Sequence, residues 1–112
     1  MTGTVVLASR YVGRISADAT LFIYAKSADS PGPPLAVLRT NAAIWPVPFR
    51  LDDTQAMLPT RKLSQFDRVV IEARISRTGN AMPSSGDLYT TSAVVRPAER
   101  KKLALVIDHE IG

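Results

Sequence analysis

Few side chains in this sequence are of the types that carry out catalysis. His109 is the only histidine and cysteine is absent, which excludes thiolate nucleophiles, disulfides, zinc–thiolate sites and iron–sulfur clusters. His109 follows Leu105 and Ile107 at the spacing of alternate strand residues, so we expect it in register with an apolar face at the edge of a core. A catalytic triad also needs a neighbouring nucleophile and an orienting carboxylate, and the sequence shows no such arrangement. We therefore expect a protein that is not an enzyme.

Metal ligands are equally sparse. Met57, Met82 and His109 invite comparison with a copper site, but a blue-copper centre needs a thiolate and two histidines, which this composition excludes. The adjacent carboxylates Asp52 and Asp53 could hold a hard cation weakly, yet paired aspartates at the end of a strand more often cap a helical turn. The sequence predicts no metal and no cofactor.

The basic charge raises the question of nucleic-acid binding. The formal net charge is +4, but the cations are scattered, and the local group from Arg96 to Lys102 is interrupted by Glu99. Tyr24 beside Lys26 has the pattern of a base-stacking platform. The aromatic residues fit core or sheet-covering positions better, and these are Phe22, Tyr24, Phe49 and Phe66. We expect no nucleic-acid partner, and a β-barrel that binds single-stranded nucleic acid is the least favoured alternative.

The segment around Arg74 has the clearest pattern in the chain. Apolar side chains occupy every second position from Val69 to Ile75, whereas Glu72 and Arg74 fall on the opposite face. We expect Arg74 to point outward into solvent and to form an ion pair there. Its expected partner is either the cross-strand neighbour of Glu72 or one of the loop carboxylates Asp52 and Asp53.

These residues need a scaffold, and apolar alternation recurs along the chain at short intervals separated by clusters of Pro, Gly, Asp and Ser. That punctuation is typical of an all-β sandwich or barrel. We expect a single domain over residues 1–112, built as an antiparallel β-sandwich of about seven strands. The predicted strands are Thr4–Arg10, Thr20–Ser27, Leu35–Thr40, Val47–Leu51, Val69–Arg77, Ser92–Arg96 and Leu103–Ile111.

Three local features refine this arrangement. Thr20–Ala25 is apolar on both faces, which predicts a central strand. Pro48 cannot donate a ladder hydrogen bond, so its strand belongs at the edge of a sheet. This edge strand and the Pro-rich segment before Leu35 could flank a groove that binds an extended peptide or an amphipathic helix. The connection over residues 52–67 is predicted to hold one or two short helical turns, with Asp52 or Asp53 as the N-cap.

Several short stretches of the chain resemble one protein family, in the same order. They are Gly3-Thr4-Val5, Thr20-Leu21-Phe22-Ile23-Tyr24-Ala25, Pro34-Leu35-Ala36-Val37-Leu38-Arg39, Leu51-Asp52-Asp53 with Met57, Leu63-Ser64, Ala73-Arg74-Ile75-Ser76, Gly79-Asn80-Ala81 and Gly86-Asp87-Leu88. Any one of them is weakly specific, but together they run over nearly the whole chain. On these residues the sequence resembles the C-terminal periplasmic domain of the cytochrome c-type biogenesis proteins of the CcmI/CycH family.

That resemblance implies a non-enzymatic role in cytochrome c maturation. Members of the family are membrane-anchored periplasmic chaperones, with a tetratricopeptide region that holds apocytochrome c for the haem-ligation machinery. The implied partners are apocytochrome c, other cytochrome c maturation proteins, or the tetratricopeptide region of the same protein. The alternative is a stand-alone β-sandwich module that binds a different protein.

The expected location depends on the same resemblance. Met1-Thr2-Gly3 leads directly into a strand without a basic leader or an apolar targeting region, which by itself suggests the cytoplasm. The resemblance implies instead an excised C-terminal module of a periplasmic protein whose parent is anchored in the inner membrane. No run of about 18 apolar residues occurs, so we expect no direct membrane insertion by this segment.

We place the partner-binding surface on two loops, Asp52 to Ser64 and Arg74 to Asp87. Each loop combines polar groups with a methionine that can adapt to an apolar partner. The candidate partner-binding residues are Asp52, Asp53, Met57, Ser64, Arg74, Ser76, Asn80, Met82 and Asp87.

Overall fold

The computed structural model describes residues 1–15, 19–30, 32–42, 45–56, 58, 60–76, 84–99 and 101–111. Its strands are β1 (Thr2–Leu7), β2 (Thr20–Ser27), β3 (Ala36–Asn41), β4 (Val47–Arg50), β5 (Val69–Ser76), β6 (Leu88–Thr91), β7 (Lys102–Ile107) and β8 (His109–Glu110). Short 3-10 helices connect them, namely η1 (Ser9–Tyr11), η2 (Asp53–Gln55), η3 (Leu63–Gln65) and η4 (Pro97–Glu99). Within the described residues, no helix has the length and hydropathy that crossing a bilayer requires.

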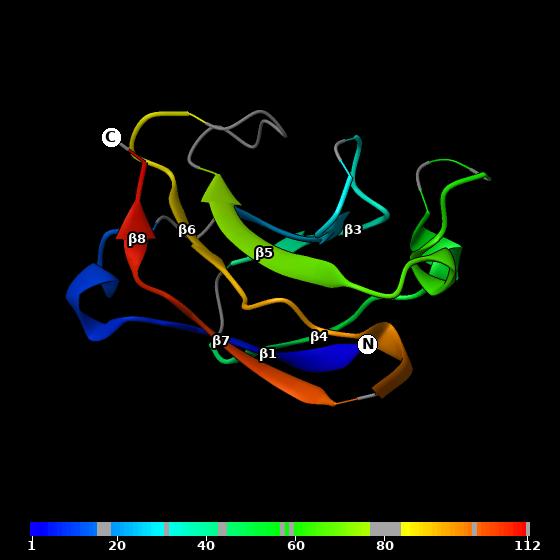
Figure 1. Cartoon of the computed structure of the whole chain (residues 1–112). Coiled ribbons are helices and arrows are strands. Elements are labelled where there is room, and N and C mark those ends of the chain that lie inside the picture. The colour runs from blue at the N-terminus through cyan, green and yellow to red at the C-terminus, as the bar shows by residue number, and fades with distance from the viewer. Residues whose placement is uncertain are drawn as a thin grey trace.

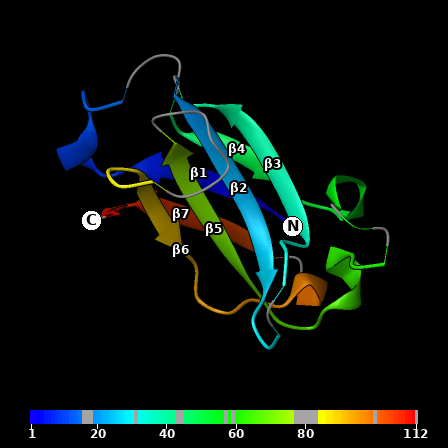
Figure 2. The same cartoon turned by 90° about the horizontal axis from the view of Figure 1, so that it is seen from above.

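The strands form two sheets that pack face to face (Figure 1). Sheet A has three strands in the order β4-β1-β7, and sheet B has five in the order β3-β2-β5-β6-β8. Seen from above, sheet B lies over sheet A (Figure 2). The predicted all-β sandwich with short helical turns is therefore confirmed.

Two predicted strand positions are also confirmed. β2 lies between β3 and β5, as the apolar character of both its faces predicts. β4, which contains Pro48, is an edge strand of sheet A, where the missing N–H of proline costs no ladder hydrogen bond. The groove expected between this edge and Leu35 stays a prediction.

The prediction of a strand over Ser92–Arg96 is wrong. The strand of this region is β6, and it ends before Ser92. The Ser92 side chain supplies the reason, because its Oγ accepts the hydrogen bond of the Ile71 N–H at 2.9 Å in place of a backbone carbonyl. Farther on, Val95 pairs with Val69 as an isolated bridge.

The outer ends of two other predicted strands are also wrong. β1 ends at Leu7, and the following residues turn into η1. The stretch Leu103–Ile111 is divided at Asp108, because the chain leaves sheet A after β7 and joins sheet B as β8. The alternation of apolar and polar residues does not reveal a change of sheet, so the sequence predicts one continuous strand.

One pairing differs from the antiparallel arrangement that the sequence suggested. β1 and β7 are parallel, with Thr2 opposite Lys102 and Leu7 opposite Ile107. Parallel and antiparallel neighbours impose the same two-residue alternation on a strand, so the pattern of side chains does not distinguish them. The other strand pairs of the described residues are antiparallel.

The core lies between the sheets and is built from alternate residues of the strands. Sheet B contributes Leu21, Ile23, Ala25, Val69, Ile71, Ala73 and Ile75. Sheet A contributes Val5, Val47, Phe49, Leu105 and Ile107. Burying each large aliphatic side chain contributes about 1.5–3 kcal/mol, so this layer holds the two sheets together.

Candidate functional site

Asp52 begins the first of the two loops expected to bind a partner, and its carboxylate caps η2. Asp52 Oδ1 accepts a hydrogen bond from the Thr54 N–H at 2.9 Å, and the Asp52 N–H donates to Gln55 Oε1 at 2.8 Å. The hydrogen bonds from the Thr54 hydroxyl and amide hold the pKa of Asp52 below its usual value. The predicted helical turn and its aspartate cap are confirmed.

Asp53 ties this turn to the next one. Its Oδ1 accepts a hydrogen bond from the Ser64 N–H at 2.9 Å, and its Oδ2 accepts one from the Ser64 hydroxyl. These bonds lower the pKa of Asp53 because they favour the ionised carboxylate. The structure therefore brings together Asp52, Asp53 and Ser64, and it uses their polar groups to close the loop between η2 and η3.

An open hollow of about 330 Å³ lies over this closed loop. Asp52, Asp53, Thr54 and Ser64 form its polar side, and its apolar side consists of Met1, Leu51, Leu63 and Pro97. The hollow is shallow and combines apolar side chains with a polar rim, which suits a protein surface better than an enclosed small-molecule site.

Arg74 and Asp87, in the second expected loop, form a buried ion pair. Arg74 Nη1 lies 2.8 Å from Asp87 Oδ2, and the two residues are 1% and 0% exposed. The Ser84 N–H also donates to Asp87 Oδ2 at 3.0 Å, and Ser76 beside them is fully buried. The guanidinium lies 5.2 Å from the centre of the Phe22 ring. The expectation of a solvent-exposed ion pair with Asp52, Asp53 or a neighbour of Glu72 is wrong.

The two expected loops do not form one surface. η3 leads into the start of β5, whereas Arg74 lies near its end, and Figure 1 shows these segments at opposite ends of sheet B. Three further candidates, Met57, Asn80 and Met82, lie outside the described residues. The hollow beside Asp53 and the ion pair of Arg74 therefore have to be considered separately, and the buried pair offers no open contact surface.

The predicted position of His109 at the edge of the core is wrong. The chain changes sheets at Asp108, so His109 is exposed and no longer in register with Ile107. Its ring lies 5.3 Å from that of Tyr89, and its Nε2 lies 3.1 Å from Asp108 Oδ1. Among the described residues, no group of three or more His, Asp or Glu side chains is placed to hold a metal ion.

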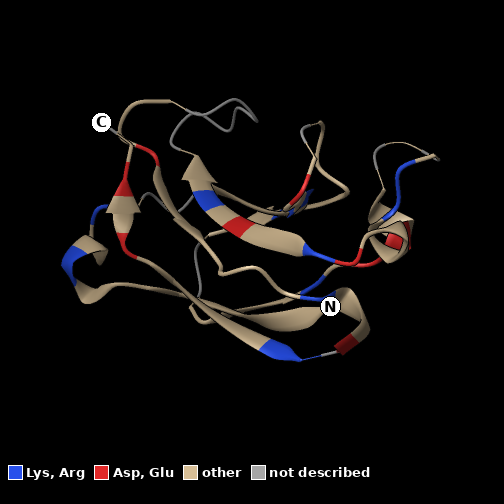
Figure 3. Ribbon diagram, viewed as in Figure 1, with Lys and Arg blue, Asp and Glu red and all other residues tan. Residues whose placement is uncertain are grey.

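Tyr24 and Lys26 do not form an exposed stacking platform. Tyr24 is only 9% exposed, and burial together with a hydrogen bond to Glu72 raises its pKa to about 12. Lys26 Nζ lies 5.2 Å from the centre of the Tyr24 ring and 3.4 Å from Glu72 Oε2. Charged residues of both signs are spread over the described ribbon (Figure 3). These observations agree with the sheet-covering role predicted for Tyr24.

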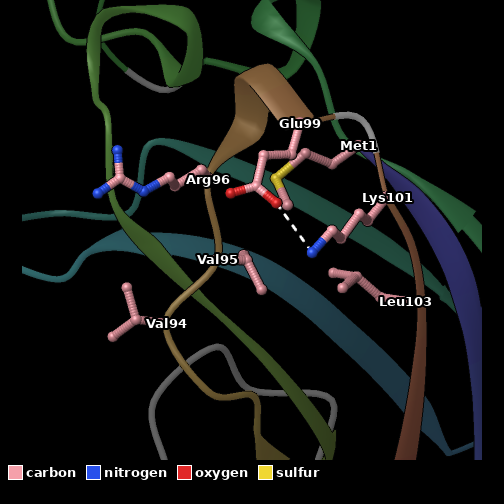
Figure 4. A pocket seen from close by; sticks show the side chains of 7 residues that line it. All are labelled: Met1, Val94, Val95, Arg96, Glu99, Lys101 and Leu103. Carbon is pink, nitrogen blue, oxygen red and sulfur yellow. Dashed lines mark ion pairs between the residues drawn. The ribbon is translucent and has the colours of Figure 1, made fainter.

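A second hollow, of about 180 Å³, was not expected from the sequence. It lies between residues 94–96 and the start of β7 (Figure 4). Its lining consists of Met1, Val94, Val95, Arg96, Glu99, Lys101 and Leu103. Three of these residues are charged, namely Arg96, Glu99 and Lys101. Their proximity to Val95 depends on packing between the two sheets, which no local pattern in the sequence reveals.

Comparison with known proteins gives a consistent assignment. Residues 1–108 match the family model described as the cytochrome c-type biogenesis protein H Ig-like domain. The chain is 36% identical over 108 residues to the cytochrome c-type biogenesis protein CycH of Pseudomonas aeruginosa. The match covers 96% of this chain but 26% of that relative, so the chain spans about a quarter of its length. No solved structure matches.

The family match and the identity to the Pseudomonas protein both extend over nearly all of the sandwich, from β1 to β7. They agree with the stretches of sequence that resemble the CcmI/CycH proteins, and with a fold made of two packed sheets. This chain belongs to the Ig-like domain family of cytochrome c-type biogenesis protein H.

Proposed function

We propose that this domain is a non-enzymatic protein-binding module of cytochrome c maturation. It contributes to the presentation of apocytochrome c, or it docks on other maturation proteins or on a tetratricopeptide region of the same protein. Its place of action is the periplasm, with the parent protein anchored in the inner membrane. The observation that carries this proposal is the match of almost the whole domain to a cytochrome c-type biogenesis protein.

The chemistry of the described surface supports protein binding. The hollow beside η2 has an apolar side that includes Leu51, Leu63 and Pro97, and the carboxylate of Asp53 at its rim is held in place by Ser64. A surface of this kind can bind an unfolded polypeptide through apolar contacts. The runner-up function, a module for an unrelated protein partner, would use the same surface.

An NMR titration tests this proposal. Unfolded, haem-free c-type apocytochrome is added to the isotope-labelled domain, and the backbone amide shifts are followed at low and moderate salt. We expect shifts at residues 51–56 and 62–65 that persist at moderate salt, because apolar contacts are screened less than phosphate contacts would be. Folded holocytochrome c serves as the control ligand.

Two variants sharpen the result. Pro97→Glu places a charge in the hollow and should weaken binding, whereas Val12→Asp changes an exposed residue near η1, away from the hollow, and should not. If apocytochrome causes no shifts, it is not the partner of this module. The same titration with a tetratricopeptide fragment then tests docking, and failure of both would overturn the proposed function.

A further inference from the structure

Strand β7 is an edge strand of sheet A: β1 is its partner in that sheet, and β6 of sheet B lies near it. The Ala8 N–H donates to the Ile107 carbonyl at 2.9 Å, so Ile107 directs its backbone polar groups toward β1. Successive residues of a strand direct these groups to opposite sides. The backbone N–H and C=O groups of Lys102, Ala104 and Val106 therefore point away from β1, where the described residues provide no further strand of sheet A.

The other edges of the two sheets are less suited to accept a strand. Just after β4, Leu51 exchanges backbone hydrogen bonds of 2.8 Å with Met1. Pro48 lies three residues before Leu51, so its position faces the outer edge of sheet A, where proline cannot donate. β8 has only two residues, which is too short to pair with a further strand. β3 contains the charged residue Arg39, and η2 packs beside it. β7 is six residues long, contains no proline and is apolar after Lys102.

The second hollow lies directly beside this edge (Figure 4). Val95 on one side is held to Val69 of sheet B by two backbone hydrogen bonds of 2.9 and 2.8 Å, and Leu103 of β7 forms the other side. A strand added to β7 would direct alternate side chains inward, toward Val95 and Leu103. A hollow of about 180 Å³ is suited to one aliphatic side chain and is smaller than the roughly 300 Å³ of typical small-molecule sites.

The charge around the edge is positive. Lys101 Nζ and Glu99 Oε2 lie 3.0 Å apart and offset each other. Arg96 and Lys102 take part in none of the ion pairs between described residues, so two cations remain at this edge. An incoming strand with carboxylates on its outward side would complement them.

We propose that the open edge of β7 binds an extended peptide segment of a partner protein in which apolar and acidic residues alternate. The segment adds to sheet A as a fourth strand and places one aliphatic side chain between Val95 and Leu103. Main-chain hydrogen bonds to Ala104 and Val106 supply affinity, and the hollow and the two cations supply selectivity. This inference rests on the proposed protein-binding function and adds to it a second contact surface, separate from the hollow beside η2.

Hydrogen exchange on the domain tests the inference. The probe is the synthetic peptide Glu-Leu-Glu-Val-Glu-Leu-Glu with blocked ends, and the control peptide has lysine in place of every glutamate. The expected result is that saturation with the acidic peptide slows exchange of the Ala104 and Val106 amides by at least about tenfold, while the Leu105 amide is already protected by β1. Unchanged exchange at Ala104 and Val106 at saturating peptide overturns the inference.

Variants provide an independent readout by isothermal titration calorimetry. Ala104→Pro removes an N–H that points to the open edge and leaves the hydrogen bonds to β1 in place, so peptide affinity should fall by about tenfold. Pro48→Ala, at the opposite edge of sheet A, is the matched control and should leave affinity unchanged. If Ala104→Pro does not fold, Arg96→Glu serves instead, and it should weaken the acidic peptide while strengthening the lysine peptide.

The outcomes separate this inference from the proposed function. Binding of apocytochrome without protection of Ala104 and Val106 would retain the proposed function and overturn the strand addition. Protection of these amides by the acidic peptide, with no binding of apocytochrome, would support the strand addition and exclude apocytochrome as the partner. Protection that depends on domain concentration and appears without peptide would show that a second copy of the chain occupies the edge, which also overturns the inference.

Discussion

Arg74 and Asp87 form the one fully buried ion pair of the described residues, and it joins the end of β5 to the residue before β6. Moving both charges out of water costs free energy, and their attraction and hydrogen bonds offset most of that cost. The pair therefore fixes the position of Asp87 relative to β5 more than it raises the stability. The exposed pair of Arg68 and Asp29, with a separation of 2.6 Å, has no comparable desolvation cost.

Removing one member of the buried pair should be strongly destabilising. Asp87→Ala leaves the Arg74 charge buried without its carboxylate and should lower the free energy of unfolding by about 3–5 kcal/mol. The double variant Arg74→Met with Asp87→Leu removes both charges and should lose much less. Urea unfolding of the variants measures these differences. Asp29→Ala is the control, with an expected loss of about 0–1 kcal/mol, and an equal loss in Asp29→Ala and Asp87→Ala would contradict the assignment.

At the level of elements, η2 and η3 are short helical turns that are joined by side chains rather than by a shared ladder. Asp52 caps the first turn, and Asp53 reaches across to the amide and hydroxyl of Ser64 at the second. Both contacts depend on ionised carboxylates, since the pKa of each aspartate is lowered by the hydrogen bonds it accepts. The ionised carboxylates of Asp52 and Asp53 therefore hold η2 and η3 in place beside the first hollow.

This dependence predicts a loss of stability in acid. A carboxylate whose pKa is lowered on folding stabilises the protein above its unfolded pKa of about 3.9, and that contribution disappears as the pH falls through the folded pKa. Asp53→Asn should therefore lower the thermal midpoint at pH 7, and the difference from the unsubstituted protein should shrink toward about pH 2.5. Asp67→Asn, at an exposed residue outside these contacts, is the control. A difference that stays constant with pH would contradict the role of the Asp53 charge.

Local patterns predict some of these elements and miss others for identifiable reasons. Alternation and proline chemistry are enough to place β2 at the centre of a sheet and β4 at an edge, because those signals lie within one strand. The end of β6 depends on the hydroxyl of Ser92 facing Ile71, and the break between β7 and β8 depends on a change of sheet at Asp108. Both are contacts between distant segments, which a single stretch of sequence does not contain.

The candidate site shows the same limit. The aspartate cap is predictable because the carboxylate of Asp52 acts within three residues. The side of the strand on which Arg74 lies is also predictable, but its burial is not, because burial depends on what packs against that side. The hollow between Val95 and Leu103 could not be predicted at all, since it lies between segments from different sheets.

At the scale of the whole molecule, β1 pairs a segment near the start of the described chain with one near its end, β7. It is the central strand of sheet A and pairs with β4 on one side and with β7 on the other. Gly3 marks the tightest part of this arrangement. A Cβ atom placed there would lie 2.4 Å from the Leu103 carbonyl oxygen and 2.9 Å from the Phe49 ring. Close packing at Gly3 therefore couples β1 to both of its neighbours.

A methyl group at this position should weaken the entire sheet. Gly3→Ala forces the Leu103 backbone or the Phe49 ring to move, and overpacking of this kind lowers the free energy of unfolding by about 1–3 kcal/mol. Chemical denaturation measures the loss. Thr2→Ala, at the exposed neighbouring position, should stay within about 0.5 kcal/mol of the unsubstituted protein. Equal stability of the two variants would show that the strands around Gly3 can separate without cost.

The parallel pairing of β1 and β7 also has a consequence for the order in which the chain folds. Thr2 is among the first described residues to be synthesised, yet its partner Lys102 follows nearly the whole sandwich. β2 and β3 are neighbours in the sequence and can pair while later residues are still being made. Sheet A is therefore complete only once β7 has joined it, and until then β1 presents an unpaired backbone edge to other polypeptides.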